Sequence, residues 1–188
     1  KVYLEGGKSA DIEIRFRHPR SNARCRLDWA VPNDKMPDAQ RLMERAVNDG
    51  TKIFIIQSAD EWSEFIAVNS KAVFKDKFFV GTNWLGGVMF NKPHDIFKEL
   101  PVGNALNWPY QALIHTGVER MGLVMEGEEL LVGAYHTYPM AIGTAMGIVP
   151  MGKGSVLFST LDIYGNIIND SAAGLVAKKL IFNMIDFK

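Results

Sequence analysis

The stretch that most constrains the fold of this chain is Met151–Ile163 (MGKGSVLFSTLDI), together with the helix-like run from Ser171 to Phe187 that follows it. The glycines of its MGKG segment mark a tight turn, because glycine reaches backbone angles that other residues avoid. Val156–Phe158 is then an apolar run of strand length, which we expect to be buried on both faces of a sheet. Ser171 fits a helix N-cap, with apolar residues at helical spacing after it. A strand that leads into a helix packed on a sheet predicts α/β architecture.

The first half of the chain repeats this pattern. Ala39–Val47 predicts a helix that ends at Gly50, and Thr51–Ile56 is the clearest buried strand of the sequence. A further strand is expected at Leu27–Val31, before the helix. Strand, helix and strand together predict a right-handed βαβ unit. We therefore expect a central sheet that is mainly parallel and flanked by helices, with an antiparallel edge or hairpin portion.

The remaining elements are shorter. Ser58 and Glu61 stand at capping-box spacing and predict a helix through Val68. Asp95–Leu100 predicts one or two helical turns in an otherwise irregular middle region, and Glu126–Gly127 predicts a hairpin turn. Four short apolar runs predict strands, namely Leu113–His115, Gly122–Met125, Leu130–Tyr135 and Ile142–Val149.

The N-terminal residues differ from the rest. Asp11–Arg17 alternates polar and apolar side chains strictly, which is typical of a strand with one wet face. Buried parallel strands are instead continuously apolar. We therefore divide the chain into residues 1–26, an edge strand or the remnant of a linker, and residues 27–188, the α/β domain.

Composition excludes several classes of partner. Lysine plus arginine and aspartate plus glutamate both number 21, so bulk charge predicts neither a nucleic-acid partner nor a membrane surface. No apolar segment approaches the roughly 20 residues that span a bilayer. The sequence begins at Lys1 without a signal-peptide pattern, so we expect a processed product or an excised domain.

Motifs for catalysis are missing from the sequence. Cys25 is the only cysteine and stands between two arginines, whereas a nucleophilic cysteine usually lies on an elbow of small residues. No Gly-x-Ser-x-Gly elbow, phosphate-binding loop or dinucleotide fingerprint occurs, and the four histidines lack metal-ligand spacing. We therefore predict no catalytic residue, no metal and no cofactor.

Aromatic residues in loops and at strand ends are the better indication of a site. Trp84, Trp108, Tyr110 and His136 are candidate ligand-binding residues, since aromatic rings stack on sugar faces or anchor protein interfaces. His136 follows a buried strand, where α/β folds place binding groups. The alternative for these rings is that large loops pack them inward.

Several segments of the sequence resemble a known family. They are Asn104–Gln111, Leu130–His136, Gly143–Gly154 and Val156–Asp162. Together they resemble the C-terminal region of bacterial family 2 glycoside hydrolases, the relatives of β-galactosidase and β-glucuronidase. That region is similar to class I glutamine amidotransferases in fold, which is flavodoxin-like, and the resemblance covers residues 27–188. No cysteine here matches the amidotransferase nucleophile, and the catalytic carboxylates of the glycosidases lie in a separate barrel domain.

This resemblance implies a non-catalytic accessory or assembly domain of a larger, secreted or periplasmic glycoside hydrolase. Its partners would be the other domains of that enzyme, with a carbohydrate or a second copy of the chain as further candidates and neither nucleic acid nor membrane expected. Two other functions stay open. One is carbohydrate binding through exposed aromatics; the other is a hydrolase with an unrecognised site, in which His136 acts as base and Asp162 as its partner.

Overall fold

In the computed structural model the described residues are 39–80, 88–106, 108–115, 121–137 and 140–187, without the side chains of Trp108 and His115. The chain divides into two units, Lys1–Met36 and Pro37–Lys188. The first unit lies wholly outside the described residues, and so do the predictions for Asp11–Arg17, Cys25 and Leu27–Val31. All that follows concerns the second unit.

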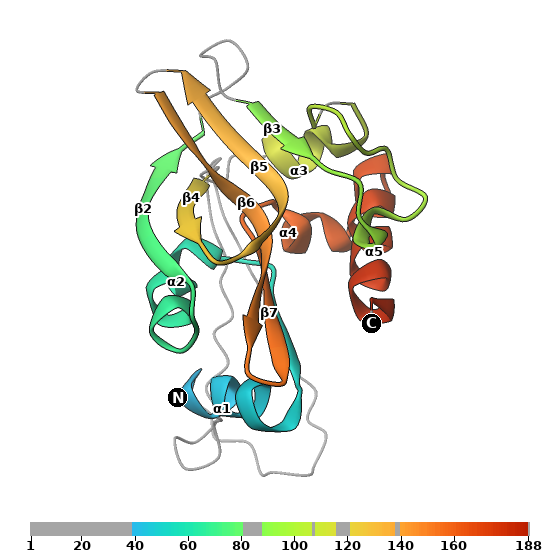
Figure 1. Ribbon diagram of the computed structural model, residues 1–188. Helices are drawn as coiled ribbons and strands as arrows, with labels where there is room; N and C mark the ends of the chain where they lie inside the picture. The colour runs from blue at the N-terminus through green and yellow to red at the C-terminus, as the bar shows by residue number, and fades with distance from the viewer. Residues whose placement is uncertain (1–38, 81–87, 107, 116–120, 138–139, 188) are drawn as a thin grey trace, which may run out of the picture. The chain divides into compact units, whose positions relative to one another are not determined.

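Figure 1 shows the elements of this unit, whose bounds are α1 (Ala39–Asp49), β1 (Lys52–Ile55), α2 (Ala59–Val68), β2 (Val73–Phe79), β3 (Val88–Asn91), the 3₁₀ helices η2 (Asp95–Phe97) and η3 (Trp108–Tyr110), α3 (Gln111–His115), β4 (Met121–Glu126), β5 (Glu129–Thr137), β6 (Met140–Met151), β7 (Gly154–Ser159), α4 (Ile163–Ile167) and α5 (Ala172–Asp186).

The seven strands form one curled, mixed sheet around β6. One edge of β6 pairs with β5, which in turn pairs with β3. The other edge is shared: β6 pairs with β7 from Met146 to Met151 and with β4 at Thr144. Beyond β7 lies β1, and beyond β4 lies β2. Thr160, just after β7, links the two strands that share this edge of β6. Its backbone N–H donates to Ala145 O of β6 (2.8 Å), and its hydroxyl donates to Met121 O of β4 (2.8 Å).

The prediction of a mixed α/β fold is confirmed, but the prediction of a mainly parallel sheet is wrong. Only β1 and β7 pair in parallel; every other pairing between described strands is antiparallel. The physical reason is the length of the connections. Residues 127–128, 138–139 and 152–153 are all that separate β4, β5, β6 and β7. A parallel pair needs a crossover of a dozen residues or more, which these connections cannot supply.

The opening stretch of the sequence folds as predicted. Gly152 adopts a φ of 59° in the turn between β6 and β7, and a Cβ there would collide with the backbone of Val47 at the end of α1. Val156 and Phe158 are buried against one face of the sheet and Leu157 against the other. Ser171 caps α5, since its hydroxyl accepts a hydrogen bond from Gly174 N (3.3 Å).

Three local predictions are wrong. Ser58 precedes α2, but it adopts a left-handed conformation (φ 53°, ψ 35°) and its side chain makes no capping bond, so the capping box does not form. Leu113–His115 belongs to the short helix α3. Glu126 and Gly127 do turn the chain, but β4 pairs with β2 and β6 while β5 pairs with β3 and β6. The turn therefore connects strands that do not form a ladder with each other.

Helices cover the sheet on both faces (Figure 1). One hydrophobic cluster lies between the sheet and the side of α3, α4, α5 and η2, with Ile96, Leu131, Met146, Leu157 and Leu180 among its buried members. The other lies between the sheet and α1 and α2, with Met43, Ile66, Leu123, Val156 and Phe158 among its members.

Candidate functional site

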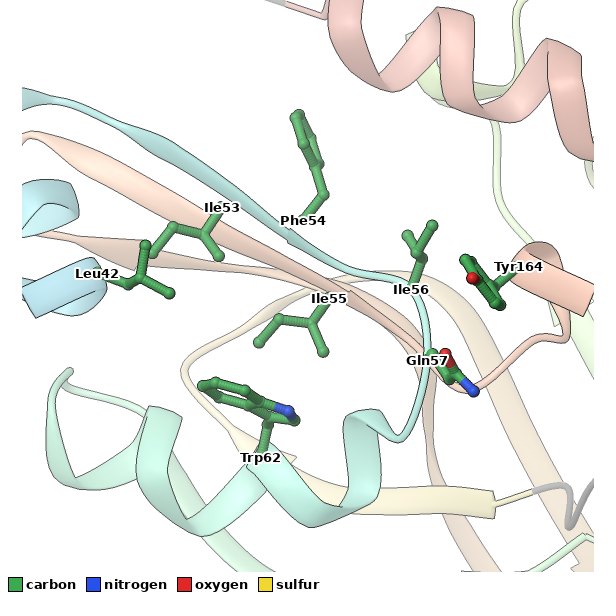
Figure 2. Close-up of a pocket in the computed structure, with 8 residues that line it drawn as sticks. All are labelled: Leu42, Ile53, Phe54, Ile55, Ile56, Gln57, Trp62 and Tyr164. Atoms are coloured by element: carbon green, nitrogen blue, oxygen red, sulfur yellow. The ribbon is translucent and has the colours of Figure 1, made fainter. Parts of the chain in front are cut away.

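An open depression of about 290 Å³ surrounds β1 (Figure 2). Its floor is the segment Ile53–Ile56, and its walls come from three helices: Leu42 of α1, Trp62 of α2 and Tyr164 of α4. Successive side chains of a strand point to opposite faces. Accordingly, Ile55 lies beside Trp62 on one side of β1, while Phe54 projects to the other side (Figure 2). The depression therefore reaches around the strand and presents apolar surface on both of its faces.

The backbone edge of β1 is part of this surface. β1 is the terminal strand of the sheet order, and no strand among the described residues pairs with its outer edge. The strand contains neither proline nor a bulge, and Lys52 is its only charged residue. Natural proteins usually protect sheet edges with such features or cover them. Phe54 leaves 36% of its surface exposed beside this edge.

The depression extends to the carboxyl ends of the two parallel strands. Gln57 follows β1, and Tyr164 lies just after the end of β7, in α4. The carboxyl ends of parallel strands are where α/β proteins bind ligands. Ser58, at the turn from β1 into α2, has the left-handed backbone that few non-glycine residues adopt. This is therefore the place in the unit where a ligand site is expected from the topology alone.

The lining of the depression supplies no acid–base chemistry. It holds no aspartate, glutamate, histidine, lysine or cysteine; its polar side-chain groups are the Gln57 amide, the Trp62 indole N–H and the Tyr164 hydroxyl. Proton transfer at neutral pH and nucleophilic attack both need a titratable or activated group within hydrogen-bond reach. The arrangement is suited to binding.

Tyr110, one of the predicted ligand-binding residues, is a core residue. Its side chain is 2% exposed and packs edge-on against Phe97. Its hydroxyl donates to Pro101 O (2.6 Å) and accepts from Asn91 Nδ2 (3.3 Å). Burial raises the pKa of the Tyr110 phenol to about 12, against the smaller opposite effect of the Asn91 hydrogen bond. Tyr110 presents no ring face to a ligand.

The other three predicted residues do not form a described site. Trp84 and the side chain of Trp108 lie outside the described residues. His136 is half-buried near the end of β5, opposite Ala141 of β6. The carbohydrate-binding prediction for this set of residues stays a prediction.

His136 and Asp162, the pair expected for a hydrolase, belong to different elements. His136 lies in β5 opposite Ala141 of β6, whereas Asp162 follows β7 and directly precedes α4. The Asp162 carboxylate caps α4 by accepting from Gly165 N (3.0 Å) and contacts the amide of Asn166 (3.3 Å). This geometry gives the hydrolase prediction no support.

Comparison with protein-family models, curated proteins and solved structures gives no match. Within the described part of the chain, no group of three or more histidine, cysteine, aspartate or glutamate side chains could hold a metal ion. The described helices are also too short or too polar to cross a membrane.

The sequence interpretation missed the residues around β1. Phe54 and Trp62 were assigned to a strand and a helix without a further role, and Tyr164 was not considered. One available signal was the rule that ligands bind beyond the carboxyl ends of parallel strands, which selects Gln57 and the residues after β7. The contribution of α1 and α2 depends on helix packing and has no local signal.

Proposed function

We propose that this domain is a non-catalytic accessory or assembly domain of a larger bacterial glycoside hydrolase. The observation that carries the proposal is the depression around β1, which combines a strand edge that no described strand pairs with, apolar surface on both faces of the strand, and a lining without a reactive group. The occupant that fits is an extended segment of the parent enzyme. Its backbone would pair with β1, and its alternate side chains would enter the two apolar sides.

The finer parts of the proposal rest on the resemblance described above. They are a flavodoxin-like arrangement, supported here by the parallel pair β1–β7 with helices on both faces, and a secreted or periplasmic location. The reading frame upstream of Lys1 should encode a sugar-hydrolysing barrel domain. A frame without one would contradict the accessory role.

The experiment uses the parent polypeptide. Phe54→Glu should lower its thermal stability by several degrees, because a charge at the β1 edge opposes strand pairing. Phe182→Glu, on the exposed face of α5, is the matched control and should leave it unchanged. The domain alone should turn over neither aryl glycosides nor glutamine. Sustained turnover that is lost with one substitution in the domain would overturn the non-catalytic assignment.

Carbohydrate binding is a second candidate function, and a different surface favours it. Phe90 and Ile142, with 40% and 64% of their surfaces exposed, lie on a face of the sheet that carries further apolar side chains. Neither Phe90 nor Ile142 was selected by the sequence analysis.

A further inference from the structure

One face of β3, β5 and the first part of β6 carries exposed apolar side chains, those of Phe90 and Ile142. Residues directly opposite each other in neighbouring strands share a face. Tyr135 of β5 stands between Val88 of β3 and Ile142 of β6, and Gly133 stands between Phe90 and Thr144 in the adjacent row. We call these two rows the outer face. The opposite face of the same strands is buried, with Met89 and Ala134 in the core.

Phe90 lies flat on this outer face. A Cβ at Gly133 would stand less than 3.0 Å from three atoms of the Phe90 ring, so the ring covers the space that a side chain would need. One side of the ring therefore rests on the Gly133 backbone. Phe90 nevertheless leaves 40% of its surface exposed. A planar ring held against the sheet with its far side in water is the geometry that stacking on a planar or flat ligand requires.

A carboxylate lies across Gly133 from this ring. The Thr144 hydroxyl donates to Glu128 Oε1 (2.6 Å), which holds the Glu128 side chain at the Thr144 position of the sheet. Phe90 and Thr144 are two strand spacings apart, about 10 Å. A carboxylate accepts up to about four hydrogen bonds, so Glu128 keeps acceptor capacity beyond the bond from Thr144.

The two rows contain no lysine, arginine or histidine. Anionic ligands and nucleic-acid backbones therefore find no positive charge in them. A ligand that matches has a flat apolar side for the ring and hydroxyl donors at its rim for the carboxylate. A neutral pyranose has both, since its C–H groups form an apolar face and its hydroxyls project outward.

We propose that the outer face is a binding site for neutral sugars, with the pyranose stacked on Phe90 and its hydroxyls donating to Glu128. Tyr135, Val88 and Ile142 would extend the apolar surface toward the next sugar unit. This inference rests on the second candidate function above and is independent of the accessory role.

The test measures binding of a panel of neutral hexasaccharides built from glucose, galactose, xylose or mannose by isothermal titration calorimetry on the full chain. At least one is expected to bind. Phe90→Ala should weaken it tenfold or more, and Glu128→Gln should weaken it several-fold. Phe182→Ala removes an exposed ring from α5 and is the matched control, with unchanged binding expected.

Gly133→Ala tests the geometry, because it keeps every ligand-contacting side chain and lifts the Phe90 ring off the sheet. It should weaken binding as much as Phe90→Ala does. The far-ultraviolet circular dichroism and melting temperature of each variant establish that it is folded.

Three outcomes would overturn the proposal. They are no binding to any member of the panel, binding that survives Phe90→Ala, and a dimer of the native chain that Ile142→Asp converts to a monomer. The last would make the outer face an interface between copies. None of these results bears on the reading frame or turnover that test the accessory role, so the two proposals fail separately.

Discussion

Two of the terminal strands of the sheet, β1 and β3, have different surroundings. At the β1 end the strands are parallel, and helices approach both faces: α1 and α2 on one side, α4 on the other. At the β3 end the strands are antiparallel, and on one face Phe90 and Ile142 keep 40% and 64% of their surfaces exposed. A parallel connection must carry a crossover over the sheet, so it brings a helix with it. The two-residue connection between β5 and β6 carries no helix over the sheet at this end.

The largest expected effect compares buried and exposed phenylalanines at the two ends. Phe158 of β7 is fully buried under α1 and α2, whereas Phe90 lies on the outer face. Phe158→Ala should lower the free energy of unfolding by about 3–5 kcal/mol, through lost burial and a cavity. Phe90→Ala should cost about 1 kcal/mol or less. Urea unfolding of both variants measures the difference, and equal losses would mean that the outer face is covered in solution.

The next prediction concerns the hydrogen bonds that join α5 to the segment around η2. Asn183 of α5 donates to Ile96 O and Lys98 O, both at 2.9 Å, in and just after η2. Asn183→Ala leaves two carbonyls without these donors and should cost about 3 kcal/mol. Asn104→Ala, which removes an exposed bond to Val102 O, should cost about 0.5 kcal/mol and is the control. Chemical denaturation measures both; similar losses would mean that the carbonyls find other donors.

A third prediction uses pH to probe the core beneath the antiparallel half. The folded-state pKa of Tyr110, about 12, lies above the ordinary tyrosine pKa of 10.0. Between these values the unfolded chain loses the phenolic proton before the folded protein does. The stabilisation is therefore complete below pH 10 and disappears as pH rises through 12, by about 2–3 kcal/mol in total. Unfolding measured from pH 9 to 12 should show this decline, and Tyr110→Phe should remove that part of it. Parallel pH curves for the two proteins would contradict the prediction.

The smallest expected effect is the difference between two glycine-to-alanine substitutions, one that strains only the backbone and one that also causes a steric collision. Gly152 and Gly103 both have positive φ (59° and 76°), but only at Gly152 would a Cβ meet backbone atoms, those of Val47. Gly103→Ala should cost about 1 kcal/mol for the left-handed conformation alone, and Gly152→Ala about 2 kcal/mol. Thermal melts of the two variants measure the gap. Equal costs would show that the β6–β7 turn moves away from α1.

The sequence predicted most elements correctly because each depends on residues close together in the chain. The helix Ala172–Asp186 follows from the Ser171 cap and apolar spacing, and β7 follows from three apolar residues after a glycine turn. The direction of the strands was predicted wrongly, although the short connections 127–128, 138–139 and 152–153 were visible. Apolar runs suited a buried parallel sheet equally well, so the connection lengths should have decided the topology.

The residues of the candidate sites could not be predicted from the sequence for a further reason. Tyr110 was selected as an aromatic residue in a loop-like segment, yet its hydroxyl donates to Pro101 O inside the core. Phe90 was not selected, and only its pairing with Gly133 keeps its ring flat and exposed. Burial and exposure of an aromatic side chain depend on residues far along the chain.

The sequence alone determined the α/β character of the described unit, its helix at α5 and the turn at Gly152, since periodicity, caps and glycine backbone freedom act over a few residues. Tertiary structure alone decided that β6 serves two branches of the sheet, that β1 keeps an unpaired edge among the described residues, and that Phe90 stays 40% exposed. The reason is that strand pairing joins segments through backbone hydrogen bonds, which every sequence offers alike. The choice among partners is made by packing and connection length, over distances that no local pattern records.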